Sequence, residues 1–171
     1  VSAVIKNYWK FLNKTLSIEE QTKLLLRENE QFLTALQASA VGNSFQFITG
    51  IYKDFFTPEQ IQEIILKVEA QNLSFISDVI RFSSPELCQN VSDYLRHLFK
   101  NDTLKLQNLL SHRNANGHTI FTFLSLQEKK YENQVNIFEN LAKDIFESEK
   151  SLKDLKIPPR FLNISIEDFQ R

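Results

Sequence analysis

Two four-residue stretches that start helices lie 40 positions apart and decide the fold of this chain. They are Ser17-Ile18-Glu19-Glu20 and Thr57-Pro58-Glu59-Gln60. In each, the hydroxyl of the first residue is placed to accept from the amide of the fourth, whose side chain reaches back to the first backbone N–H. Pro58 favours the second start further, because proline presets φ at the first helical position. Both stretches therefore predict helix starts of one kind.

Other elements keep the same offset of 40 residues. An aliphatic triplet follows each start, at 24–26 and at 64–66, and a hydroxyl followed by apolar residues comes later, at 34–36 and at 74–76. A third, partial copy of the pattern follows at 104–121. Self-similarity with a period of about 20 to 50 residues is typical of repeat arrays. The chain is therefore expected to be a stack of helical units.

The composition describes a domain with a sizeable core and little charge bias. The 171 residues are 42% hydrophobic, and the formal net charge is −1. Such a chain has no excess positive charge for a phosphate backbone, so we expect no nucleic-acid partner. No stretch approaches about 18 consecutive apolar residues, so we expect no membrane span. The single cysteine, Cys88, excludes an intrachain disulfide and fits a reducing, cytoplasmic location.

Apolar residues at helical spacing predict a predominantly α-helical chain. Ser44 is expected to cap a helix, Gly42 to end one, and the aromatic residues after Ser44 to be core. Whether 44–68 holds two helices or one long bent helix stays open. The expected helices span about residues 2–14, 18–28, 34–41, 45–56, 58–69, 74–82, 85–100 and 130–148.

The run from Leu109 to Phe121 resembles the junction between ankyrin repeats. In that family, a leucine-ending outer helix is followed by a finger-like loop, an Asn or Asp three residues before a Gly, and a Thr that opens the next inner helix. Asn114, Gly117 and Thr119 occupy those positions here. Glycine at such a site supplies a turn with positive φ, and the Thr hydroxyl caps the helix.

The stretch 34–40 resembles the inner-helix motif of the same family. Gln37 stands where the family has His, and Ala35 where it has Pro. Phe32 and Asn72 occupy the glycine position in the first two copies. The units are also about 40 to 45 residues long, against about 33 in the family. The resemblance is therefore to a degenerate, long-helix form of the repeat.

We expect an all-α fold, a short ankyrin-like α-solenoid of stacked helical hairpins without a substantial sheet. Another α-solenoid and a non-repeating helical domain are the alternatives. Because the chain begins at Val1 rather than Met, it is expected to be part of a longer protein. Residues 1–171 are expected to form one domain with units at 8–48, 49–91 and 92–148 and an extension at 149–171.

Helical solenoids present extended binding surfaces. The resemblance implies that partner contacts lie on the fingers and on the exposed side of the inner helices. We therefore expect a non-catalytic scaffold that binds a partner protein by complementarity, as a monomer or weak oligomer. The residues that this places at the interface are Arg27, Glu28, Glu30, Gln31, Glu69, Gln71, Asn72, His112, Arg113, Asn116 and His118.

No catalytic residue, metal site or cofactor is expected. Cys88 and His97 share a helix in no recognised catalytic arrangement, so Cys88 is expected to be a small buried residue. His112 and His118 lie six positions apart across a glycine loop, which matches no common zinc spacing. The three glycines do not cluster into a phosphate-binding loop.

Two other functions stay open. The first is a regulatory or targeting arm of a larger effector or toxin whose catalytic domain lies elsewhere. Such an arm would act in the host cytoplasm if an intracellular bacterium secretes it, and the Lys-, Asn-, Ile- and Phe-rich composition is typical of AT-rich coding sequences. The second is a helical enzyme with an unrecognised site, which a deep pocket with converging polar side chains would favour.

Overall fold

The computed structural model describes residues 2–28, 34–42, 44–70, 75–112, 119 and 129–145. Every regular element within these ranges is helical, which confirms the prediction of an all-α fold. The elements are α1 (Ser2–Thr15), α2 (Ile18–Leu25), α3 (Ala35–Val41), α4 (Phe45–Phe55), α5 (Pro58–Ala70), α6 (Phe75–Phe82), α7 (Pro85–Leu98), α8 (Thr103–Ser111), the 3-10 turn η1 (Lys129–Tyr131) and α10 (Glu132–Ile145).

A group of three helices occurs twice in the same order. The short helix α6 begins 40 residues after α3, and α7 begins 40 residues after α4. The third helix, α8, begins 45 residues after α5, because α7 is 14 residues long and α4 only 11, and because the connector after α7 is also longer than the one after α4. Before the first group, α2 begins 40 residues ahead of α5, so α1 and α2 correspond to α4 and α5.

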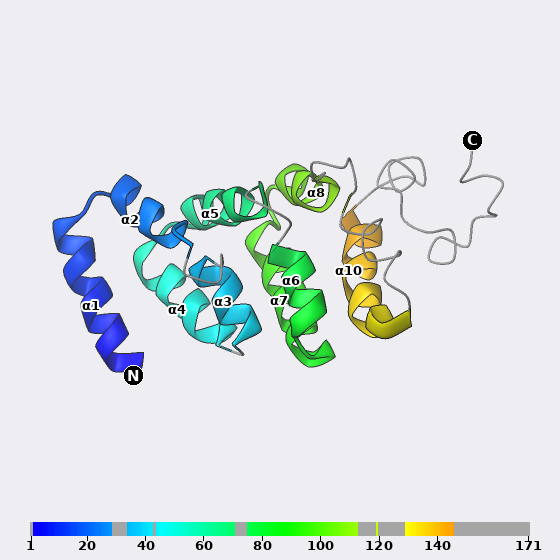
Figure 1. Ribbon diagram of the computed structural model, residues 1–171. Coiled ribbons are helices and arrows are strands. Elements are labelled where there is room, and N and C mark those ends of the chain that lie inside the picture. The colour runs from blue at the N-terminus through cyan, green and yellow to red at the C-terminus, as the bar shows by residue number, and fades with distance from the viewer. Residues whose placement is uncertain are drawn as a thin grey trace.

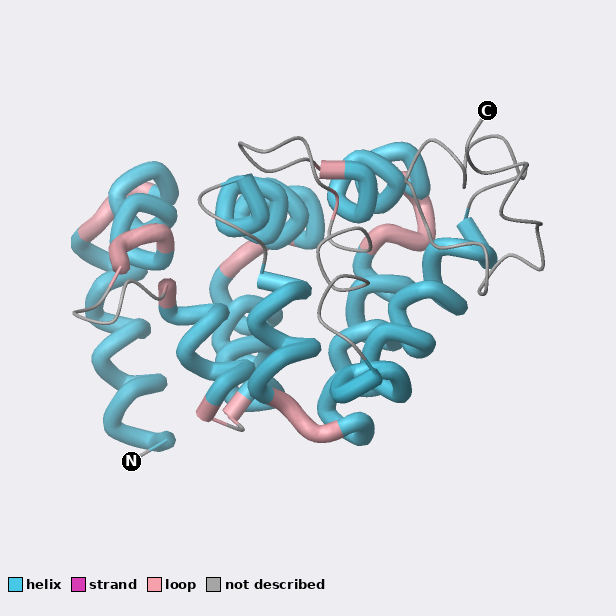
Figure 2. The backbone as a smooth tube through the Cα atoms, turned by 45° about the vertical axis from the view of Figure 1, so that its right-hand side comes forward, coloured by secondary structure: helices cyan, strands magenta, loops and turns pink. Residues whose placement is uncertain are grey.

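The helices form a row with a separate layer along one edge. Figure 1 shows α1, α4, α7 and α10 following one another along the row, with α2, α5 and α8 lying across their upper ends. The tube in Figure 2 shows the same layering from a second direction. The short helices α3 and α6 pack against α4 and α7 and also against each other. Neighbouring groups therefore touch through both their long and their short helices.

Both predicted helix starts are confirmed as capping boxes. Ser17 Oγ accepts from the Glu20 N–H at 3.2 Å, and Glu20 Oε2 accepts from the Ser17 N–H at 2.8 Å. Thr57 Oγ1 accepts from the Gln60 N–H at 3.3 Å, and Gln60 Oε1 accepts from the Thr57 N–H at 2.9 Å. Each box satisfies two amides that a helix start otherwise leaves unpaired.

The prediction that Ser44 caps α4 is wrong. No side-chain hydrogen bond caps that helix, and Ser44 Oγ instead donates to the Ser39 carbonyl at 3.3 Å. The backbone at Ser44 has φ −120° and ψ 21°, outside the extended region that a capping residue usually adopts. The open question about 44–68 is settled as two helices, α4 and α5, that meet at Phe56 and Thr57.

Several helix ends differ from the sequence expectation. The second helix was expected to reach residue 28, but α2 ends at Leu25, because the Arg27 N–H turns back to the Leu24 carbonyl at 3.2 Å in a tighter turn. The helix expected over 85–100 ends at Leu98. The helix expected over 130–148 starts as the 3-10 turn η1 and continues as α10 to Ile145, and 146–148 lie outside the described residues.

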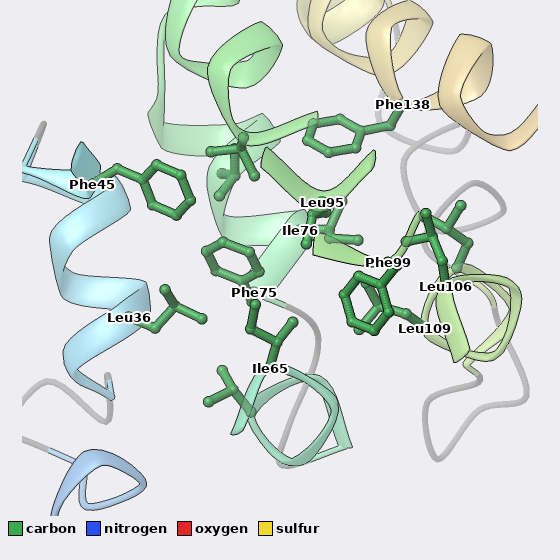
Figure 3. Packing of buried hydrophobic residues seen from close by; sticks show 14 of the residues in the cluster. Leu36, Phe45, Ile65, Phe75, Ile76, Leu95, Phe99, Leu106, Leu109 and Phe138 are labelled. Carbon is green, nitrogen blue, oxygen red and sulfur yellow. The ribbon is translucent and has the colours of Figure 1, made fainter. Parts of the chain in front are cut away.

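One hydrophobic core runs from α2 to α10. At the junction of the two groups, the Phe45 ring stacks on Phe75 with ring centres 6.1 Å apart and meets the Tyr94 ring edge-on at 5.5 Å. In Figure 3, Leu36 and Phe45 of the first group lie on the side of Phe75 opposite Phe99 and Leu109 of the second. Burial of aromatic rings in such offset and edge-on contacts joins the groups into one body.

The aromatic residues after Ser44 belong to this core, as predicted. Phe45, Tyr52 and Phe56 are buried, and Phe55 is half-buried. The side chain of Phe47 lies outside the described residues. Gly42 follows the last residue of α3, as expected, and its N–H donates to the Ala38 carbonyl at 2.8 Å.

Candidate functional site

Most of the residues predicted to bind a partner fall on the connectors before the short helices. Of these, Arg27 and His112 are exposed and Glu28 is half-buried, each just beyond the end of α2 or α8. Glu69 lies in the last turn of α5, and its side chain is outside the described residues. The residues Glu30, Gln31, Gln71, Asn72, Arg113, Asn116 and His118 also lie outside them. The binding role of these fingers therefore stays a prediction.

The short helix α3 begins with a third capping box. Gln37 Oε1 accepts from the Thr34 N–H at 3.0 Å and from Thr34 Oγ1 at 2.9 Å. The Gln37 N–H reaches Thr34 Oγ1 at 3.4 Å. Both side chains are buried. Thr and Gln three positions apart are themselves a helix-start signal, so this box has a local sequence signature independent of the family motif.

The same glutamine links the two short helices. Gln37 Nε2 donates to Asp78 Oδ2 in α6 at 3.0 Å. The Asp78 carboxyl is half-buried, and burial raises its pKa while the Gln37 hydrogen bond and the Arg81 charge oppose that rise. Because all the polar atoms of the Gln37 amide are engaged, its side chain is held in one orientation. The amide therefore sets how α3 and α6 lie against each other.

The exposed end of α6 carries side chains that suit a protein partner. Phe82 is 56% exposed, and the Arg81 guanidinium carbon lies 5.2 Å from the centre of its ring. Both follow Asp78 within one helical turn. We call the surface formed by Asp78, Arg81 and Phe82 the short-helix face. It combines an acid, a cation and an exposed aromatic ring on α6, and the buried Gln37 side chain joins α6 to α3 through its hydrogen bond to Asp78.

A groove between the long helices α4 and α7 is the second candidate. Its volume is about 490 Å³, and its lining is mainly apolar. Lys53 and His97 are exposed at its edge, and burial raises the pKa of Tyr94 to about 12, which keeps that hydroxyl protonated at neutral pH. The groove suits an apolar side chain or small apolar ligand rather than the polar chemistry expected of an enzyme. Its apolar lining comes from Phe56, Pro58, Ile61, Tyr94 and Leu98.

A larger, polar hollow of about 700 Å³ lies where α4 and α7 begin. Ser84 Oγ caps α7 by accepting from the Leu87 N–H at 3.2 Å, whereas Ser44 leaves the start of α4 without a side-chain cap. Glu86 lines this hollow and is exposed, so its carboxylate is not in the desolvated setting that acid–base catalysis uses.

Cys88 is a buried packing residue, as predicted. Its side chain is fully buried in α7, and Sγ donates to the Val79 carbonyl at 3.5 Å. Burial raises the pKa of the thiol to about 12, so the reactive thiolate form is suppressed at neutral pH. Within the described ranges, no three His, Cys, Asp or Glu side chains come together as a metal site would require.

Among the helices that the structure describes, none has the length and apolar character needed to cross a membrane. In comparisons with known proteins, no family model, no curated protein and no solved structure matches this chain.

Proposed function

We propose that this chain is a non-catalytic scaffold, ankyrin-like in plan, that holds a partner protein on its short-helix face and on the connectors beside it. The observation that carries this proposal is the hydrogen bond from Gln37 to Asp78, because it ties α3 and α6 into one platform. A surface that is rigid before binding loses less conformational entropy when a partner docks. Repeated helices with a fixed spacing are well suited to present such a surface.

The chemistry of the face defines what the partner offers. Phe82 is suited to contact an apolar side chain of the partner. Arg81 is suited to pair with a carboxylate of the partner while its guanidinium stays over the Phe82 ring. Aromatic and arginine side chains carry much of the binding energy at protein interfaces. The predicted finger residues, of which Arg27 and His112 are exposed at two connectors, would border this face and add polar contacts.

The test is a selection of binders from a displayed protein library on the immobilised full chain, followed by affinity measurements on variants. Phe82→Ala and Arg81→Glu are each expected to weaken selected binders by about tenfold or more, a typical loss at an interface hot spot. Leu104→Ala is the matched control, because Leu104 is a 65% exposed apolar residue on α8. Unfolding midpoints of all three variants should stay close to that of the native chain.

Binders that ignore both substitutions would contradict the proposal. Loss of binding through His97→Ala or Lys53→Ala alone would move the site to the groove between α4 and α7.

A further inference from the structure

Exposed apolar side chains at the N-terminal end include two at positions that the next unit buries. Tyr8 and Phe11 on α1 are each 60% exposed, and Leu24 on α2 is 40% exposed. Forty residues later, the counterparts of Phe11 and Leu24 are Ile51 and Ile64, which are each 1% exposed. We call the surface formed by Val4, Tyr8, Phe11 and Leu24 the α1 face. Phe11 and Leu24 are thus open at positions that are buried forty residues later, whereas the counterparts of Val4 and Tyr8, which are Ser44 and Ile48, are exposed and half-buried.

The junction between α1 and α4 shows how such a face is covered. Lys6 Nζ of α1 lies 3.4 Å from Asp54 Oδ2 of α4. Three residues further along α1, the Trp9 ring lies 6.3 Å from the ring of Phe56, at the end of α4. A charged residue and an aromatic residue spaced by three thus dock one long helix on the next.

Two matching positions occur at the C-terminal end of α1 and just beyond it. Asp54 and Phe56 correspond, 40 residues earlier, to Lys14 and Leu16. Leu16 lines a surface hollow of about 630 Å³, whose lining is mainly apolar and includes Leu24. A helix that lay on α1 as α1 lies on α4 would bring its charged residue to Lys14 and its aromatic ring to Leu16, at this hollow.

The charged residues near the α1 face determine which charge a docking helix should carry. Lys14 and Arg27 are exposed and have no ion pair within 4 Å among the described residues. Of the acids nearby, Glu19 pairs with Lys23 at 2.9 Å, Glu20 closes its capping box, and Glu28 is half-buried. The open charge is therefore positive, and a carboxylate complements it.

We propose that the α1 face binds an amphipathic helix of a partner protein that carries an acidic residue and, three positions later, a large aromatic residue. The carboxylate pairs with Lys14, and the ring enters the hollow at Leu16. A second copy of this chain fits poorly through α1, since that helix has three lysines and no acid. Binding to a lipid surface would not depend on the fixed spacing between Lys14 and the hollow at Leu16.

The probe for this proposal is a peptide with the sequence of residues 2–15 and the change Lys6→Glu. It is hydrocarbon-stapled between positions 4 and 8, which are exposed when α1 lies on α4. The stapling is needed because isolated helices shorter than about 12 to 15 residues are marginal in water, and circular dichroism verifies the helix. Affinity for the full-length chain is measured by fluorescence anisotropy.

The test compares the two peptides, with Lys6 or with Lys6→Glu, on the native chain and on the Lys14→Glu variant. The Lys6→Glu peptide is expected to bind the native chain about two- to fivefold more tightly than the Lys14→Glu variant, as an exposed ion pair allows. The peptide that keeps Lys6 is expected to show the reverse preference. Phe11→Ala is expected to weaken binding by about tenfold, whereas the Leu104→Ala control leaves it unchanged.

Three results would overturn the proposal. One is no binding by a peptide whose helix has been verified, and another is binding that is equal in all four charge combinations. The third is that the native chain prefers phosphatidylserine vesicles or a second copy of itself to the peptide, and that Phe11→Ala removes this preference. Vesicle binding would assign the face to a membrane, and dimer formation would assign it to a second copy.

Discussion

The two helical groups α3–α5 and α6–α8 follow one plan with different side chains. Tyr52 in α4 is fully buried, and Ser92 at the matching position of α7 is 1% exposed. Phe45 is part of the aromatic junction, whereas its counterpart Pro85 is an exposed first residue of a helix. What recurs at about 40 residues is therefore the order of the helices, whereas burial is kept at some matched positions, such as Tyr52 and Ser92, and not at others, such as Phe45 and Pro85. The residue at each position is free to change, provided that its neighbours fill the space.

The largest difference between the two groups in free energy of unfolding is expected when the matched residues Tyr52 and Ser92 are each replaced by alanine. Tyr52→Ala is expected to lower the free energy of unfolding by about 3–5 kcal/mol, because it leaves a cavity in the core. Ser92→Ala is expected to be neutral or stabilising, since Ser92 Oγ is buried without a hydrogen-bond partner among the described atoms. Urea unfolding measures both.

Tyr52→Phe is the control for the ring itself. The Tyr52 hydroxyl is also buried without a partner in the part of the chain that the structure describes. Removing it should therefore cost little. A large loss for Tyr52→Phe would show that the hydroxyl has a partner which this account omits.

Gln37→Ala is expected to have the next largest effect on the free energy of unfolding, because it removes the hydrogen bond between α3 and α6. The substitution removes the side chain that caps α3 and leaves Asp78 without its amide donor. We expect a loss of about 1–3 kcal/mol, the usual cost of stranding a buried polar group. Gln46→Ala, at an exposed residue of α4, is the matched control. Equal thermal midpoints for the two variants would contradict a structural role for Gln37.

The serines that precede α4 and α7 are also expected to differ in how much they contribute to stability. Ser84→Ala is expected to cost about 1 kcal/mol, since Ser84 Oγ caps α7. Ser44→Ala is expected to cost less than half of that, because Ser44 makes no cap. Chemical unfolding of the pair gives the difference directly, and a larger loss at Ser44 would mean that α4 is capped in solution.

The parts of the fold that could be predicted from sequence are those encoded locally. The boxes at Ser17 and Thr57 depend on two side chains three residues apart, so their spacing was sufficient. Cys88 could be assigned to the core because it matches no catalytic arrangement and because a free cysteine is usually buried. A cap at Thr34 is likewise predicted from its hydroxyl, whereas the contact by which Gln37 completes the box is not, although its signal is equally local.

The parts that could not be predicted depend on contacts between distant residues. Gln37 and Asp78 are 41 residues apart, and nothing in either local sequence pairs them. Phe11 has the apolar spacing of a core residue, so its exposure appears only once α1 is placed at the end of the row (Figure 1). The finger residues remain predictions from the family resemblance.

The smallest expected effect is a dependence on pH. Because burial raises the pKa of Asp78 in the folded state, its ionisation costs stability, and this cost grows as pH rises from the unfolded value through the folded one. Asp78→Asn removes that cost, so its midpoint relative to the native chain is expected to rise between pH 4 and pH 7. Glu20 acts in the opposite direction, since the capping box lowers its pKa and its contribution is lost in acid. A flat difference between Asp78→Asn and native would contradict the assignment.

The most direct test of the central claim, that α3 and α6 form one coupled platform, is a double-mutant cycle on unfolding free energy. The cycle compares Gln37→Ala, Asp78→Ala and the double variant with the native chain. The account predicts a coupling energy of about 0.5–3 kcal/mol, as for residues in direct contact. Additive losses, with coupling near zero, would mean that the two short helices are not joined through this bond and would remove the main support for the proposed scaffold.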